Sequence, residues 1–162
     1  MQDIPIAAIN EHSFNHKHPK YYKSQVFRII GAAMRVHSEL RWGLLEPIYN
    51  EALCIELRNS GIECESEQEI TCYYKDQPLS KKYRMDIVVG DDICIELKSV
   101  SELLPEHRAQ LMNYLRLTKR PIGILINFGQ RSLQGERYGF FSDTNECFIL
   151  DKNMNILSDD ED

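Results

Sequence analysis

The segment PIGILINF, residues 121–128, limits the possible folds more than any other part of the chain, because it is almost wholly apolar. A strand with one solvated face alternates apolar and polar side chains. A continuous apolar run of about this length is instead typical of a strand covered on both faces. We therefore predict a doubly covered strand at this position.

The segments around this strand predict how it joins a sheet. Residues 105–120 are typical of a helix with Pro105 at its start, and residues 93–100, ICIELKSV, are typical of a strand. A strand, a helix and a second buried strand imply a right-handed crossover, so the two strands should be parallel. Strands at residues 67–75 and 83–89 should complete a three-stranded antiparallel meander, and residues 138–153 should add an edge hairpin or strand.

The first part of the chain predicts two helices. Apolar side chains recur at helical spacing over residues 24–40, and a second helix is expected over residues 45–61. Residues 1–22 are polar and residues 158–162 are acidic. The expected organisation is a flexible polar arm (1–22), one α/β domain (23–157) and an acidic tail (158–162).

Composition narrows the class of protein. With 43% apolar and 27% charged residues, the 162-residue chain suits one globular domain. No apolar run is long enough to span a membrane and the N-terminus lacks signal-peptide features, so we expect a cytoplasmic protein. The five cysteines include no C-x-x-C pair, which argues against a disulfide framework, a zinc site or an iron–sulfur cluster.

The net charge of −6 does not exclude a nucleic-acid partner. Four of the 25 acidic residues lie in the tail, so the rest of the chain carries 21 acids against 19 bases. The body is nearly neutral and has local basic clusters, although it is not the strongly basic surface of a general DNA-binding protein.

A pair of carboxylates is expected where two of the strands meet. In residues 93–100, Ile93, Ile95 and Leu97 share one face, and Glu96 and Lys98 share the other. If residues 90–92 form a three-residue loop, Val89 pairs with Ile93, and Asp86 then lies directly opposite Glu96. Their Cβ atoms would be about 4.5–5.5 Å apart.

Two like charges at that separation are destabilising unless a positive charge lies between them. Lys98 is one candidate for that charge, and a divalent metal ion is a better one. The ordinary alternative is a salt bridge between Glu96 and Lys98 on a solvated sheet face, since the tripeptide E-x-K is common by chance.

Two helical motifs supply further polar groups. GLLEPIY, residues 43–49, places Glu46 in the first turn of the second helix, where a carboxylate also favours the helix dipole. The later helix carries Gln110 and Tyr114 at positions i and i+4, which alone are compatible with a surface role.

Together these residues resemble the PD-(D/E)XK nuclease superfamily, in its RecB-like branch; the ordered set is Glu46, Asp86, Glu96-x-Lys98 and Gln110-x-x-x-Tyr114. GLLEPIY, with AAMRVHSEL before it and ILINFG after it, is similar to the GxxExxY protein family in particular. The resemblance covers roughly residues 24–130. Met85 replaces the proline of the superfamily name and Arg41-Trp42 precede Gly43, but neither departure removes a chemical group.

The resemblance implies a restriction-endonuclease-like α/β fold and metal-dependent cleavage of DNA. Mg²⁺ or Mn²⁺ would be held by Asp86, Glu96 and the Leu97 carbonyl, with Glu46 acting through water or on a second ion. Lys98 would orient the attacking water and stabilise developing charge. The resemblance further implies that Gln110 orients the lysine, the water or a phosphate, and that Tyr114 supports the site.

Other interpretations remain open at this stage. His37 and His107 are conceivable phosphate contacts, although structural or surface roles are favoured for both. The chain could be a non-catalytic module that binds nucleic acid or protein on a nuclease-like fold, which the weakly basic surface favours. It could also be a nuclease that acts on RNA.

Overall fold

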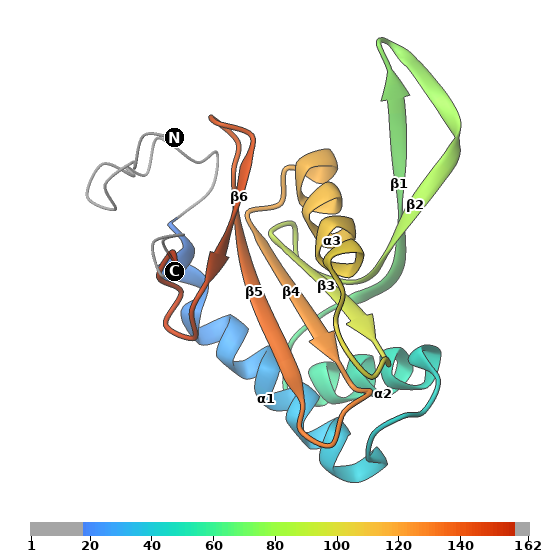
Figure 1. The fold of residues 1–162 in the computed structure, drawn as a ribbon, viewed down its shortest axis with the longest axis vertical. Helices are drawn as coiled ribbons and strands as arrows, with labels where there is room; N and C mark the ends of the chain where they lie inside the picture. Colours follow the sequence, from blue (N-terminus) through green and yellow to red (C-terminus); the bar gives the residue numbers. More distant parts are fainter. Residues whose placement is uncertain (1–17, 158–162) are drawn as a thin grey trace.

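The structure, a computed structural model, describes residues 18–157 and contains one six-stranded sheet with helices on both faces (Figure 1). The strands lie in the sheet in chain order. The elements, in chain order, are a 3-10 helix (Pro19–Tyr22), α1 (Lys23–Leu40), α2 (Glu46–Asn59), β1 (Glu65–Tyr74), β2 (Gln77–Val89), β3 (Ile93–Lys98), α3 (Pro105–Thr118), β4 (Ile122–Asn127), β5 (Gln134–Phe141) and β6 (Glu146–Leu150).

The predicted topology is confirmed. The first three strands pair antiparallel, α3 crosses over, and β4 lies parallel to β3. All six residues of β4 are buried, as expected for a strand covered on both faces. The last two strands extend the sheet as an antiparallel pair beside β4.

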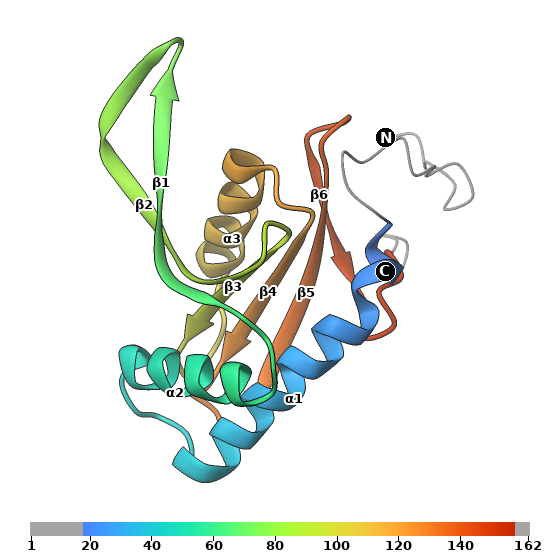
Figure 2. The same ribbon diagram turned by 180° about the vertical axis from the view of Figure 1, so that it is seen from behind.

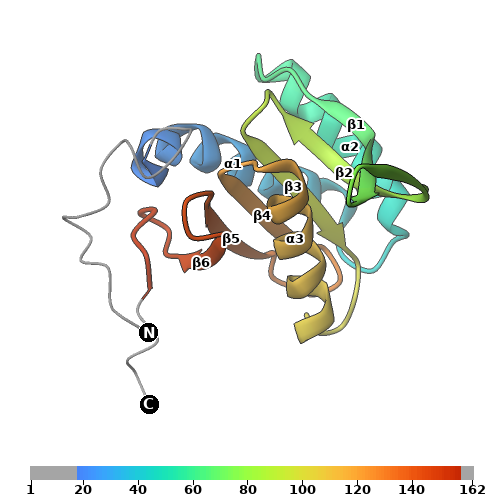
Figure 3. The same cartoon turned by 90° about the horizontal axis from the view of Figure 1, so that it is seen from above.

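Alternation along the central strands divides the apolar core into two layers. Ile95 and Leu97 of β3 face α1 and α2, whereas Cys94 of the same strand packs with α3. Seen from above, the first two helices lie on one side of the sheet and α3 lies on the other (Figure 3). The carboxylate face of β3 is therefore the face that α3 covers.

The hairpin of β1 and β2 is longer than expected. β2 begins at Gln77 and not near Tyr83, and the hairpin projects well beyond the body of the domain (Figures 1 and 2). Residues 77–84 are exposed on both faces, so they have no reason to alternate apolar and polar side chains, and the sequence pattern misses them.

Met85 lies on the opposite side from the one that alternation predicts. Strict alternation along β2 would put Met85 on the face of Ile87 and Val89, but it packs with Val88 and α3. Glu67 lies in β1 opposite Asp86 of β2, and it has a positive φ of 56°. This local departure from extended backbone accompanies the strong twist that turns the hairpin away from the sheet.

The predicted arm ends earlier than residue 22. Pro19–Tyr22 form a 3-10 helix, Tyr22 is buried, and its hydroxyl donates to Asp92 Oδ2 at 2.6 Å. The burial of this aromatic ring ties the segment to the domain. The rest of the predicted arm, and the acidic tail at residues 158–162, lie outside the described residues. No helix between residues 18 and 157 is both long and apolar enough to cross a bilayer.

A buried amide joins the ends of β3 and β4. Asn127 Oδ1 accepts from the N–H groups of Val100 (3.0 Å) and Gly129 (2.9 Å), and its Nδ2 donates to the Val100 carbonyl at 2.9 Å. A Cβ on Gly129 would lie 2.1 Å from the Val100 oxygen. Only glycine therefore lets these two backbone segments approach so closely.

We predict opposite effects for two glycine substitutions. Gly129→Ala should lower the free energy of unfolding by on the order of 1–3 kcal/mol, because backbone atoms must move apart. Gly31→Ala, in the middle of α1, should raise it by up to about 1 kcal/mol, since its Cβ would meet only Arg35 Nη1 at 3.7 Å. Urea denaturation of both variants measures this, and a neutral Gly129→Ala would contradict the close approach.

Candidate active site

The centre of the site is the point where β2 separates from β3. Ladder pairing runs from Val89↔Ile93 to Ile87↔Ile95, which is the register that the three-residue loop predicts. One residue beyond Ile87 and Ile95, hydrogen bonds between a backbone N–H and a carboxyl side chain replace the backbone–backbone bonds. The Asp86 N–H donates to Glu96 Oε1 at 3.0 Å, and the Leu97 N–H donates to Asp86 Oδ2 at 2.8 Å.

Burial makes this carboxyl pair hard to ionise fully. Glu96 is 2% exposed, and burial followed by the charge of Asp86 raises its pKa to about 9. Burial also raises the pKa of Asp86, against the lowering effect of the Leu97 N–H. With both pKa values raised, the pair in the absence of a cation favours the state in which the two carboxyl groups share one proton.

Lys98 is held by α3 and not by the carboxylates. Its Nζ donates to Gln110 Oε1 at 3.0 Å, and Gln110 Nε2 donates to the Tyr114 hydroxyl at 2.9 Å. Among the described residues, no carboxylate oxygen lies within 4.0 Å of Lys98 Nζ. Glu96 and Lys98 therefore do not form the ordinary salt bridge that was the alternative from the sequence. The ammonium group is aimed by an amide beside the carboxyl pair.

Tyr114 holds Gln110 in place through its hydroxyl group. It is 3% exposed, and burial, with the charge of Glu96, raises the pKa of its phenol, which therefore stays protonated at neutral pH. Its ring contacts that of Tyr83 with centroids 5.6 Å apart. Because the Lys98 ammonium group can only donate, the Gln110 oxygen faces Lys98 and the Gln110 amide nitrogen faces the Tyr114 hydroxyl.

The GLLEPIY motif places Glu46 by fixing the loop in front of it. Gly43 has a φ of 86° and donates its N–H to the Phe128 carbonyl at 3.2 Å. The buried Tyr49 hydroxyl accepts from the Leu44 N–H at 3.0 Å and donates to the Arg41 carbonyl at 2.6 Å. The Tyr49 ring also stacks on Phe128. These contacts determine where α2 begins.

Glu46 faces the carboxyl pair from the first turn of α2. Its pKa is raised, first by burial and then by the negative charge of Asp86, while Lys98 opposes the shift. The structure therefore brings all the predicted side chains to one region, from α2, β2, β3 and α3.

Asn50 is a site residue that the sequence analysis missed. Its Nδ2 donates to the Asp86 carbonyl at 3.2 Å, and its Oδ1 accepts from Ser66 Oγ at 2.8 Å. It thereby ties α2 to the backbone of β2 at Asp86. Its position four residues after Glu46, on the same helical face, was the available signal.

A second missed interaction holds α3 on the sheet. Arg108 binds Glu136 of β5 through Nε at 2.9 Å and Nη2 at 2.8 Å, and the buried Tyr138 donates to the same carboxylate at 2.6 Å. Since Gln110 lies one helical half-turn beyond Arg108, this ion pair also sets the position of Gln110. The residues lie 28 apart in sequence, so no local pattern reveals the pairing.

Each of the two histidines makes a hydrogen bond with a backbone group. His37 is 9% exposed and its Nε2 lies 2.8 Å from the Gln130 carbonyl oxygen. His107 Nδ1 accepts from the Leu104 N–H at 2.9 Å, at the start of α3. Both contacts agree with the structural roles that were favoured from the sequence.

The donor atoms at the centre suit a hard divalent cation. Asp86 and Glu96 each bind a backbone N–H through one oxygen, and the other oxygen of each carboxyl is not used by those bonds. Two carboxylates with water and substrate oxygens match the preference of Mg²⁺. Within residues 18–157 no three side chains of His, Cys, Asp or Glu group closely enough to hold a metal ion by themselves.

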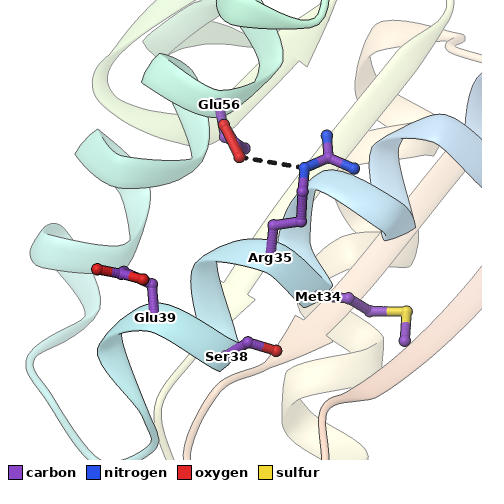
Figure 4. A pocket seen from close by; sticks show the side chains of 5 residues that line it. All are labelled: Met34, Arg35, Ser38, Glu39 and Glu56. Atoms are coloured by element: carbon purple, nitrogen blue, oxygen red, sulfur yellow. Dashed lines mark hydrogen bonds and ion pairs between the residues drawn. The ribbon is translucent and has the colours of Figure 1, made fainter.

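A separate depression lies between α1 and α2, on the face away from α3. It is lined by Met34, Arg35, Ser38, Glu39 and Glu56, with an ion pair of 3.1 Å between Arg35 Nε and Glu56 Oε1 (Figure 4). It shares no residue with the carboxyl site, and we assign it no part in the chemistry.

Comparison with known proteins gives one family. The family model described as the PD-(D/E)XK nuclease superfamily matches residues 23–138. No curated protein matches the chain. A solved structure described as "Crystal structure of SSO0001" is similar, with 22% identity and a TM-score of 0.48, over 74% of this chain and 60% of that one. The chain thus spans less than two thirds of that protein.

The protonation of the carboxyl pair gives a testable pH dependence. The folded pKa of Glu96, about 9, lies above its ordinary value of 4.5. Between these values the folded protein keeps a proton that the unfolded chain has lost, so the free energy of unfolding falls as pH rises, by at most about 1.4 kcal/mol per pH unit. Below pH 4.5 both states are protonated and the effect disappears.

Glu96→Gln should reduce this decline, because the amide supplies a donor toward Asp86 and an acceptor for its N–H at every pH. Denaturation in EDTA from pH 5 to 8.5 measures the slope, with the exposed Glu102→Gln as the control. Parallel curves for wild type and Glu96→Gln would contradict a shared proton.

Proposed function

Since the chain belongs to the PD-(D/E)XK nuclease superfamily, we propose that it is a Mg²⁺- or Mn²⁺-dependent nuclease that hydrolyses phosphodiester bonds of DNA. We further propose that it is a member of the GxxExxY family in the RecB-like branch and acts in the cytoplasm. The observation that carries the proposal is the pair of the half-buried Asp86 and the buried Glu96, with Lys98 held beside it by Gln110.

The carboxyl pair explains why an ion is needed. In the absence of metal the pair favours holding a proton, because Glu96 is buried beside the half-buried Asp86 and two like charges there repel. Asp86, Glu96 and the Leu97 carbonyl would hold the ion, and Glu46 would contribute through water. When bound, the ion supplies charge neutralisation at a phosphate oxygen and a more acidic water.

The protein groups around the pair would position the reactants. Lys98, fixed by its bond to Gln110, would hold the attacking water and stabilise negative charge that develops on the phosphate oxygens. Tyr114 would keep Gln110 in the required orientation. Water would attack phosphorus in line with the leaving oxygen, and the P–O bond opposite would break. The attacking water would lose a proton to solvent, and the leaving oxygen would take up a proton from solvent.

The first prediction from this proposal concerns activity. Lys98→Ala and Glu96→Gln should each reduce cleavage of labelled DNA by about 10²-fold or more, because each removes a group that acts on charge in the transition state. Unchanged circular dichroism would show that both variants fold. Single-stranded DNA, duplex DNA and RNA compared under the same conditions identify the substrate. Full activity of Lys98→Ala would reject its assigned role.

The second prediction concerns metal binding without turnover. Mg²⁺ or Mn²⁺ should raise the melting temperature of the wild type, because the ion binds the folded site; at 100 times its dissociation constant it adds about 2.7 kcal/mol. Asp86→Asn should lose most of this response. The effect should strengthen with pH, since binding displaces the proton of Glu96. A wild type that is indifferent to millimolar metal at matched ionic strength would favour a non-catalytic binding module.

A further inference from the structure

Three loops meet beside the active site, at the end of the sheet where β3 and β4 finish (Figures 1 and 2). They comprise residues 41–45, 99–104 and 128–133, and we call them the loop platform. Hydrogen bonds join each loop to the next. Ser99 Oγ donates to the Leu44 carbonyl at 2.5 Å, and Gln130 Nε2 donates to the Ser101 carbonyl at 2.6 Å.

The loop platform is fixed to the core as well. The Gly43 N–H reaches the Phe128 carbonyl, His37 contacts the Gln130 carbonyl, and Asn127 binds the backbone of residues 100 and 129. Because these bonds link loops that are distant in the sequence, the platform presents its outer side chains from a rigid base.

The outer surface of the loop platform combines an aromatic ring with cations. Trp42, the only tryptophan of the chain, is 42% exposed, and Arg131 Cζ lies 5.5 Å from the centroid of its indole ring. The charged residues of the platform are Arg41, Arg131 and Glu102, which leaves a net positive charge on a chain whose total is −6.

This surface adjoins the site directly. The residue before Ser99 is Lys98, and the residue after Leu45 is Glu46, so two of the three loops begin or end at a site residue. The loop platform therefore borders the site, and a polynucleotide bound at Glu46 and Lys98 can extend across it.

We propose that Trp42 and Arg131 bind an unpaired nucleotide of the substrate, with the base stacked on the indole and an adjacent phosphate on the guanidinium. The inference rests on the proposed nuclease function and gives it a substrate class. An indole can stack only on a base whose face is free, and in a duplex the faces are already stacked. The substrate is therefore a single-stranded segment, either free or at the end of a duplex.

The sole tryptophan makes this binding observable. Wild-type protein in EDTA, which prevents cleavage, is titrated with a thymidine oligonucleotide while indole fluorescence is recorded. Stacking should quench the emission. A blunt duplex should quench much less at the same nucleotide concentration, and inorganic polyphosphate, which has charge but no base, should not quench. Equal quenching by polyphosphate or by the duplex would overturn the proposal.

Variants test the energetic contribution of each side chain. By anisotropy of a labelled oligonucleotide, Trp42→Ala should weaken binding on the order of 10-fold, as expected for loss of one stacked base, and Trp42→Phe should restore part of it. Arg131→Ala should weaken binding and reduce its salt dependence. The matched control is Phe27→Ala, which removes a 75% exposed ring from α1 without touching the loop platform.

The outcomes separate this inference from the proposed function. If wild type cleaves nucleic acid but Trp42→Ala binds as well as Phe27→Ala, the loop platform is not the binding surface, and the nuclease assignment stands. If Trp42→Ala loses binding while wild type cleaves nothing with any metal, the binding surface is supported and the nuclease assignment is wrong.

Discussion

Two carboxyl groups that cannot both be charged lie at the end of the β2–β3 ladder, and the rest of the site is arranged around them. Asp86 and Glu96 replace the next pair of backbone hydrogen bonds with bonds from their own side chains. β2 can therefore turn away from the sheet without leaving the N–H groups of Asp86 and Leu97 unpaired. The same arrangement keeps the buried Glu96 beside the half-buried Asp86, where a proton or a cation relieves the repulsion between the two carboxylates.

The remaining side chains of the site hold two helices in position relative to that pair. Asn50 and the loop braced by Tyr49 place the start of α2, and therefore Glu46. The Arg108–Glu136 ion pair places α3, and therefore Gln110 and Lys98. The proposed reaction would require close placement of these groups, so the distant contacts should affect activity although they do not touch the substrate.

The parts of the site that were predictable from the sequence are those that local rules control. The loop at residues 90–92 sets the register of two strands, and alternation then puts Asp86 opposite Glu96. Gly43 and Pro47 mark the start of α2 in a similar way. Asn50, Asn127 and the Arg108–Glu136 pair could not be predicted, because their roles depend on contacts between segments that are distant in the sequence. Met85 was misplaced because alternation assumes an even strand, and β2 twists sharply beside Glu67.

The order of strands in the sheet also bears on how the site is assembled. Every strand pairs with its neighbour in the chain, so the sheet can grow in the order in which a ribosome delivers the residues, through mostly short loop closures. Asp86 and Glu96, ten residues apart, are brought together by the β2–β3 hairpin, which precedes α3 and β4 in the chain. Burial, which is the main cause of the raised pKa values, follows only when α3 packs on that face of the sheet, so proton uptake should accompany the packing of α3 and not the closure of the hairpin.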